Sequence, residues 1–460
     1  MSNHHRLTRR HLLAVGSGAL VAATGLGALA GCAGGQAPAT AAPEPTKPAA
    51  QPAATAAPAS KGPVTITWQY WPVGGKAWTD VVEQTVVNPW NKAHPDIQVK
   101  DSAIPGSDIQ TKLMAQVAAG TAPDLTAIDN YWYLGFAARG AFVRLDDLIS
   151  RDKYDLSVFL DVALTEGLYK QKRFGIPYIG STRIIYFNID LFKAAGVTTP
   201  DKLWDQGQWT WDKLVEIGQQ LTKKESSGKI TQFGILPDTS INVNSPWIWG
   251  AGGEILDKDR TKCLLNQPAA VEGLQFQQDM IFKYRISPNN EEMQDIDLFA
   301  TGKVGLVPSW RGPSIIYRTY NFKWDIVPMP VGKAGKTTLY KGNSMCIPKS
   351  SKLVDQAWEF SKWVCGPEAG RVYVLNGGAT ARKDNIKDLT ESKPPDHGQW
   401  YMSPLQEGWA KLLPFVPQWT ELQVEVDKAF EQIFFEKGDV KQAMDAVAPK
   451  VDQILSQPVS

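Results

Sequence analysis

The chain of 460 residues has a formal net charge of +1, and 43% of its residues are hydrophobic. These values exclude a disordered or collagen-like polymer. The near-neutral charge also disfavours a nucleic-acid binder, because neutralising phosphates requires a dense cationic face. Since single hydrophobic cores stop growing at roughly 250 to 300 residues, we expect the ordered part to form at least two lobes.

Residues 1–32 have the order of an export signal, with cations first, then an apolar run, then small residues. The pair Arg9-Arg10 resembles a twin-arginine signal, which exports proteins already folded. Leu29-Ala30-Gly31-Cys32 resembles a bacterial lipobox, which predicts that Cys32 is lipidated and becomes the mature N-terminus. The alternative is a transmembrane helix, but four glycines weaken the apolar run as a permanent span. Acyl chains on Cys32 would anchor the protein to a membrane without crossing it.

Residues 33–62 are almost entirely Ala, Pro, Thr, Gly and Gln, without an aromatic or large aliphatic side chain. Such a segment cannot bury enough surface to offset its ordering entropy. We therefore expect a disordered tether between the anchor and the folded body.

The folded body offers little material for enzyme chemistry. Its only histidines are His94 and His397, and no His-Glu-x-x-His or Cys/His ligand spacing occurs. We expect no metal, no cofactor and no catalytic residue, although a pair of glycosidase carboxylates stays open among so many acidic residues. Three further cysteines could form one disulfide, but small buried apolar side chains are the favoured interpretation: Cys263, Cys346 and Cys365.

Strand and helix patterns alternate along the body. β-branched runs predict strands at 64–68, 97–99, 123–128 and 186–187. Apolar residues at helical spacing predict helices at 78–93, 108–119, 190–195, 210–223, 267–283 and 353–365. Gly120 is suited to a left-handed cap after the second helix. Strands alternating with helices at these lengths indicate α/β lobes with mainly parallel sheets flanked by helices.

Five motifs, in order, resemble those of the carbohydrate-binding family 1 of extracellular solute-binding proteins of ABC importers, which includes maltose-binding protein. No single motif is diagnostic, but their order and spacing together are specific. They are Ala118-Ala119-Gly120-Thr121-Ala122-Pro123-Asp124-Leu125 with the following Ala138 to Asp146, Phe174-Gly175-Ile176-Pro177-Tyr178 with Ile185 to Gly196, Trp209-Thr210-Trp211-Asp212-Lys213-Leu214, Phe299 to Leu306, and Ala357-Trp358-Glu359-Phe360.

The resemblance implies a two-lobed fold of the type II periplasmic-binding-protein class, joined by a hinge of crossing strands. By position, lobe 1 would comprise 63–182 and 305–342, and lobe 2 would comprise 183–304 and 343–460. The crossings would lie near 181–185, 303–306 and 340–345. It also implies a lipid-anchored, monomeric receptor at the outer face of the cell membrane or in the periplasm, which delivers a carbohydrate to ABC permease subunits.

A sugar presents an apolar C–H face to an aromatic ring, and its hydroxyls require donors and acceptors around the rim. Several loops at predicted strand ends pair tryptophan or tyrosine with such groups, and ligands collect at the carboxyl ends of parallel strands. The resemblance places further candidates in the second lobe and on the third crossing. The predicted ligand-binding residues are Tyr70, Trp71, Asp129, Asn130, Trp132, Trp249, Trp310, Arg311, Asn343 and Trp419.

Two other functions share these binding features. A secreted carbohydrate-active hydrolase would differ by catalytic turnover of its ligand. A sensor that presents its ligand to a signalling partner would differ by its partner.

Overall fold

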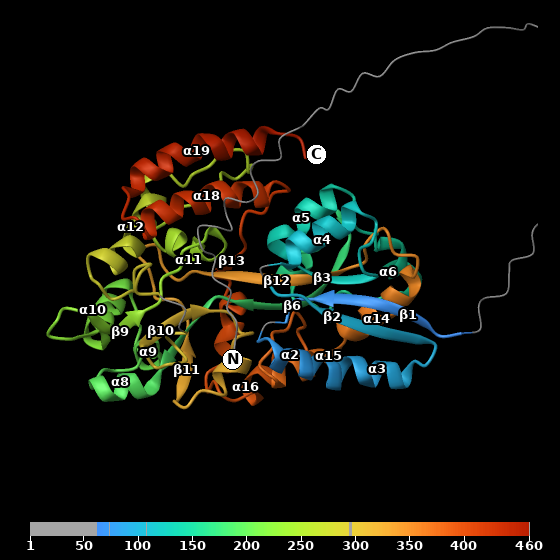
Figure 1. The fold of residues 1–460 in the computed structure, drawn as a ribbon, viewed down its shortest axis with the longest axis horizontal. Helices are drawn as coiled ribbons and strands as arrows, with labels where there is room; N and C mark the ends of the chain where they lie inside the picture. Colours follow the sequence, from blue (N-terminus) through green and yellow to red (C-terminus); the bar gives the residue numbers. More distant parts are fainter. Residues whose placement is uncertain (1–61, 73, 107, 294–296, 460) are drawn as a thin grey trace, which may run out of the picture. The chain divides into compact units, whose positions relative to one another are not determined.

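The computed structural model describes residues 62–72, 74–106, 108–293 and 297–459. The predicted export signal, lipobox and nearly all of the tether lie outside these residues. Residues 63–460 form one compact unit, which contains two larger sheets (Figure 1). Within the described residues, no helix combines the length and the hydropathy needed to cross a membrane.

The first sheet has the strand order β13-β12-β3-β1-β2, and β6 pairs with the other edge of β12. β1, β2 and β3 run parallel to one another, whereas β12 runs antiparallel to both β3 and β6. Its strands are β1 (Val64–Tyr70), β2 (Ile97–Ala103), β3 (Leu125–Asp129), β6 (Gly175–Thr182), β12 (Thr338–Cys346) and β13 (Ala410–Lys411).

Helices cover both faces of the first sheet (Figure 1). α4 and α5 lie on one face, and α2, α3 and α15 lie on the other. The helices of this part of the chain are α2 (Lys76–Val82), α3 (Asn88–Ala93), α4 (Ile109–Ala118), α5 (Asn130–Ala138), α6 (Asp146–Asp152), α7 (Asp161–Thr165), α13 (Ser314–Tyr317), α14 (Val354–Val364), α15 (Pro367–Leu375), α16 (Asp388–Glu391) and α17 (Ser403–Gln406). A π-helical turn over Glu83–Val87 joins α2 to α3, and the small hairpin of β4 (Leu168–Tyr169) and β5 (Lys172–Arg173) precedes β6.

The second sheet has the order β11-β7-β10-β9-β8. β9 and β10 are parallel, and β7 is antiparallel to β10 and β11. Its strands are β7 (Ile184–Asn188), β8 (Lys223–Lys224), β9 (Ile230–Ile235), β10 (Val304–Ser309) and β11 (Trp324–Val327). The neighbouring helices are α8 (Ile189–Ala195), α9 (Pro200–Asp205), α10 (Trp211–Leu221), α11 (Ile241–Gly250), α12 (Pro268–Phe282), α18 (Trp419–Phe434) and α19 (Val440–Ser456).

The predicted helices and strands of the body are confirmed to within a few residues. Gly120 adopts the left-handed conformation expected of a cap, with φ of 68°. The helix predicted at 78–93 is one helical segment that the π-helical turn interrupts. The cysteines Cys263, Cys346 and Cys365 are buried and not disulfide-bonded, as the preference for small apolar side chains predicted.

The strand pairing differs from the expected lobe ranges in two places. β10 and β11 lie in the range 305–342 expected for lobe 1, but both pair with β7 in the second sheet. β12 pairs with β3 and β6 through Cys346 in the first sheet. The strands at 304–309 and 338–346 each stay within one sheet. The chain therefore passes from the first sheet to the second at Arg183, and it returns to the first sheet between β11 and β12.

Candidate functional site

A cavity of about 120 Å³ lies where the segment after β10 meets the strands β6 and β12. It therefore joins the end of a second-sheet strand to two strands of the first sheet. Three tryptophans contribute apolar surface, and Lys341 and Asn343 of β12 contribute polar groups. The lining residues are Trp71, Trp78, Ile179, Gly180, Ser181, Trp310, Gly312, Pro313, Lys341, Asn343, Gly378 and Ala379.

Lys341 is the charged centre of this cavity. Its Nζ lies 2.6 Å from Oδ2 of Asp129, and the two side chains are only 10% and 2% exposed. The same ammonium lies 5.4 Å from the ring centroid of Trp71, 4.9 Å from Tyr131 and 5.2 Å from Trp310. A cation this close to aromatic faces is attracted by the ring quadrupoles, and desolvation strengthens that attraction. The site thus holds a neutralised ion pair inside a cage of three rings.

The backbone fixes Asp129 in this position. Asp129 ends β3 and is the N-cap of α5, where its side chain accepts a hydrogen bond from the backbone N–H of Tyr131 at 3.2 Å. An N-cap aspartate satisfies one of the free amides of the helix and favours the helix dipole. One carboxylate therefore starts α5 and anchors Lys341.

A second ion pair flanks Trp310 on the side of the second sheet. Arg183 pairs with the buried Asp238 and donates a hydrogen bond to the carbonyl of Pro308 at 3.0 Å. Its guanidinium lies 5.3 Å from the ring centroid of Trp310. Burial raises the pKa of Asp238, while the charge of Arg183 acts in the opposite direction. Trp310 therefore lies within about 5 Å of two cations, and each of them is balanced by a carboxylate.

Glu166 lies behind β12, buried beside the backbone of the cavity wall. Its Oε1 accepts a hydrogen bond from the backbone N–H of Gly342 at 3.2 Å. Burial raises the pKa of the Glu166 carboxyl to about 8. A Cβ atom at residue 342 would overlap Oε2 of Glu166. Gly342 is therefore required by a close approach to this carboxyl.

The structure brings part of the predicted site together. Trp71, Trp310 and Asn343 line the cavity, and Asp129 reaches it through Lys341. Asn130 is buried beside them, and its Oδ1 accepts a hydrogen bond from Ser344 at 3.2 Å. Trp132 packs against two apolar clusters and does not line the cavity.

Four predicted contact residues are instead packed in the interior, so the structure corrects their assignment as ligand contacts. Tyr70 is 1% exposed, with its ring 4.6 Å from Trp68. Trp249 and Trp419 are 3% and 1% exposed and belong to an apolar cluster. Arg311 is fully buried, and its Nη2 donates to the carbonyl of Val374 at 2.8 Å. Protein groups therefore surround these four side chains.

Sequence reasoning missed Lys341, Trp78 and Ser181 as lining residues. Lys341 lies on the predicted third crossing beside Asn343, so its position was a usable signal. Trp78 was only the first residue of the helix predicted at 78–93. Ser181 lies at the start of the predicted first crossing, so its position was a signal of the same kind.

A comparison with protein families shows which family the chain belongs to. Residues 69–371 match the family of bacterial extracellular solute-binding proteins. The chain belongs to that family. Among curated relatives of this solute-binding protein, a binding protein of Brucella abortus (strain 2308) is 25% identical over 386 residues, covering 81% of this chain and 90% of the relative. The arabinooligosaccharide-binding protein of Bacillus subtilis (strain 168) is 26% identical over 314 residues, covering 65% of this chain and 69% of the relative.

Solved structures place the fold of this solute-binding protein in the same group. An ABC substrate-binding protein from Listeria monocytogenes in complex with cycloalternan has a TM-score of 0.77 at 23% identity, covering 86% of this chain and 99% of that one. A maltose-bound protein of T. maritima has a TM-score of 0.73 at 20% identity, with coverages of 85% and 99%. The fold is therefore the two-lobed α/β fold expected from the sequence.

Proposed function

We propose that this solute-binding protein captures a carbohydrate, an oligosaccharide or a glycoside, and delivers it to an ABC permease. The observation that carries the proposal is the cavity lined by Trp71, Trp78 and Trp310, in which the Lys341 ammonium, paired with Asp129, lies beside the rings of Trp71 and Trp310. The rings offer faces for sugar C–H groups. The Lys341 ammonium offers donors, and the Asn343 amide offers a donor and an acceptor, for hydroxyl groups.

The relatives support this ligand class. Printed names among them include an arabinooligosaccharide-binding, a lactose-binding and a multiple sugar-binding protein. Solved relatives of the same fold hold cycloalternan, maltose and mannotriose. The balanced charges at the cavity fit a neutral ligand better than a strongly anionic one, because each cation already has a carboxylate partner.

The size of the cavity requires a conformational change in this proposal. Pockets that bury drug-sized ligands measure roughly 300 to 1,000 Å³, and this cavity measures about 120 Å³. We propose that the sheets separate to admit ligand by hinge motion at Arg183 and at residues 328–337, which connect β11 to β12. Ligand would then stabilise the closed arrangement by its higher affinity for it.

We also propose that the chain acts as a monomeric, non-enzymatic receptor that Cys32 anchors to the membrane after export. Its location would be the periplasm or the outer face of the cell membrane. Lipid analysis of the mature N-terminus tests the anchor: a diacylglycerol thioether on Cys32 is expected, and an unmodified Cys32 in the exported protein would contradict it.

Thermal shift against a panel of neutral oligosaccharides tests the binding function. Stabilisation grows as RT ln(1 + [L]/Kd), so a ligand at about 100 times its Kd adds about 2.7 kcal/mol. Binding without turnover supports the receptor, whereas hydrolysis of a bound sugar would establish the secreted hydrolase instead.

A further inference from the structure

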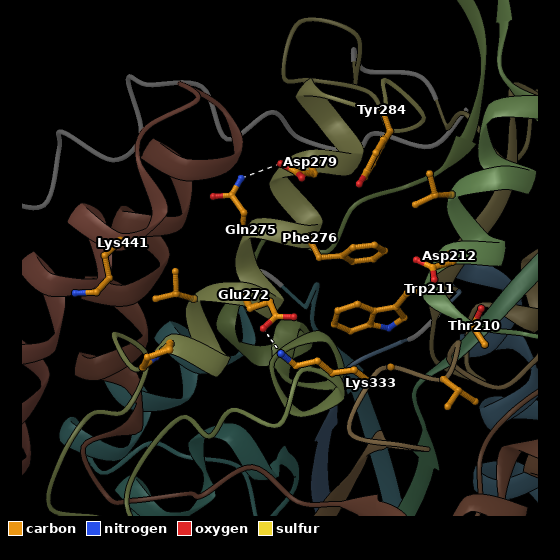
Figure 2. Close-up of a pocket in the computed structure, with 15 residues that line it drawn as sticks. Thr210, Trp211, Asp212, Glu272, Gln275, Phe276, Asp279, Tyr284, Lys333 and Lys441 are labelled. Carbon is orange, nitrogen blue, oxygen red and sulfur yellow. Dashed lines mark hydrogen bonds and ion pairs between the residues drawn. The ribbon is translucent and has the colours of Figure 1, made fainter.

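A second and larger concavity lies away from the cavity at β12. It encloses about 950 Å³ and shares no lining residue with that cavity. Its walls come from the start of α10, one face of α12, the residue Tyr284 and the loop at 331–333 (Figure 2). The lining residues of α12 run from Pro268 to Asp279 at helical spacing, so the groove extends for roughly 16 Å along the helix.

Two stacked aromatic rings form the centre of the groove. The rings of Trp211 and Phe276 lie 4.3 Å apart at an interplanar angle of 16°. Both side chains are only partly buried, although tryptophan and phenylalanine usually dominate cores. Figure 2 shows the two rings in the middle of the groove, with the Asp212 carboxylate beside the indole. An aromatic surface open to solvent beside an acceptor has the composition that sugar faces require.

The rim of the groove supplies polar groups of both kinds. Lys333 pairs with Glu272, and Gln275 donates a hydrogen bond to Asp279 at 2.8 Å (Figure 2). Among the residues that the structure describes, Asp212 forms no ion pair, so its carboxylate is an available acceptor. The charges of the rim nearly cancel. A strongly charged polymer therefore gains little electrostatic binding free energy from these groups.

We propose that the groove between α10 and α12 is a second carbohydrate-binding site that takes a neutral oligosaccharide of a few units. Its aromatic pair stacks on a sugar face, and Asp212 and Tyr284 bond to hydroxyls. The groove is open, so it binds more weakly than an enclosed cleft. Binding in the groove does not depend on ligand binding at β12. The groove gives the receptor a second surface that holds a sugar chain.

Indole N–H signals in nuclear magnetic resonance spectra of the ¹⁵N-labelled chain test the site. The Trp211 signal is assigned with Trp211→Phe. Titration with maltotriose and mannotriose is expected to shift it with saturation in the millimolar range, at about 1 mM for a free energy near −4 kcal/mol. The shift is expected to persist in the double variant Trp71→Ala, Trp310→Ala, which impairs the cavity at β12 but leaves the groove intact.

Three variants locate the binding. Asp212→Asn exchanges one acceptor oxygen for a donor and removes the charge, and Tyr284→Phe removes the hydroxyl; each is expected to weaken trisaccharide binding about fivefold. Glu216→Gln is the matched control, because it lies on the exposed face of α10 outside the groove, and it is expected to leave binding unchanged.

Three results would overturn the proposal. They are the absence of a saturable Trp211 shift up to about 10 mM of either sugar, a shift that disappears in the Trp71→Ala, Trp310→Ala variant, and equal binding by the groove variants and the control. A Trp211 shift caused by a tripeptide and not by either trisaccharide would also overturn it. If the cavity at β12 binds no sugar while the groove does, the proposed function fails and the groove proposal stands.

Discussion

The ammonium of Lys341 and the carboxylate of Asp129 lie 2.6 Å apart and almost fully buried, at the point where β12 runs beside β3. Lys341 belongs to the strand that follows the last passage between the sheets, whereas Asp129 starts α5. The ion pair therefore links β12, which follows the second proposed hinge segment, to α5, which follows β3. A ligand between the aromatic rings would contact Lys341, whose position Asp129 fixes.

Replacing Lys341 with methionine is expected to weaken carbohydrate binding by about tenfold or more, because it removes a charge-assisted donor. It also leaves Asp129 buried without its cation, which costs about 3 to 5 kcal/mol of folding free energy. The double variant Lys341→Met, Asp129→Asn is expected to recover most of this stability but not the affinity. Calorimetric titration and urea unfolding separate the two effects.

Lys362 provides the matched control for that experiment. It pairs with Asp152 at 2.8 Å, with side-chain exposures of 25% and 20%, and it is not among the residues that line the cavity. Lys362→Met is expected to leave sugar affinity unchanged. A loss of affinity as large as that of Lys341→Met would contradict the role of Lys341.

Gly342→Ala is expected to destabilise the fold by about 1 to 3 kcal/mol, because the new methyl group overlaps the Glu166 carboxyl. Shortening the neighbour in the double variant Gly342→Ala, Glu166→Ala is expected to restore part of this loss. Urea unfolding measures both. Additive losses in the double variant would show that the two residues do not compete for space.

Glu166 is expected to make stability depend on pH. Burial raises its pKa from 4.5 to about 8, so the folded chain holds a proton that the unfolded chain has lost between these values. The free energy of unfolding should therefore fall as pH rises from about 4.5 to about 8, by at most about 1.4 kcal/mol per pH unit from this group, and level off above that range. Glu166→Gln should remove this component, and an unchanged slope would refute the assignment.

Two classes of tryptophan are expected to respond differently to substitution. Trp310→Ala removes a ring that lines the cavity and should lower affinity by about fivefold or more, equivalent to about 1 kcal/mol. Trp249→Phe and Trp419→Phe change buried rings and should lower stability while affinity stays within about twofold. If calorimetric titrations show that Trp249→Phe and Trp419→Phe lower affinity while Trp310→Ala leaves it unchanged, the ligand lies against Trp249 and Trp419 instead.

The fold was predictable because its signals are local. Apolar spacing located α4, α10, α12 and α14, and Gly120 marked the end of α4. Strand pairing was less predictable, since β10 and β11 join β7 through long-range contacts that no local pattern records. This is why the expected lobe ranges differ from the sheets.

The candidate site was predictable only in part. Trp71 follows the first predicted strand, and Trp310 was selected by the resemblance; both line the cavity. The strand-end rule failed for Tyr70 and the resemblance failed for Trp249, because solvent exposure depends on how distant segments pack around a residue. Trp419 and Arg311 failed for the same reason, since packing around them comes from distant segments.

Calorimetric titration of the purified chain with neutral oligosaccharides, combined with chromatography of the sugar recovered afterwards, tests the central claim most directly. The account predicts saturable binding at the cavity, loss of that binding in Lys341→Met and Trp310→Ala, and recovery of the sugar unchanged. Absence of binding across the panel, binding that both variants retain, or recovery of a cleaved sugar would contradict it.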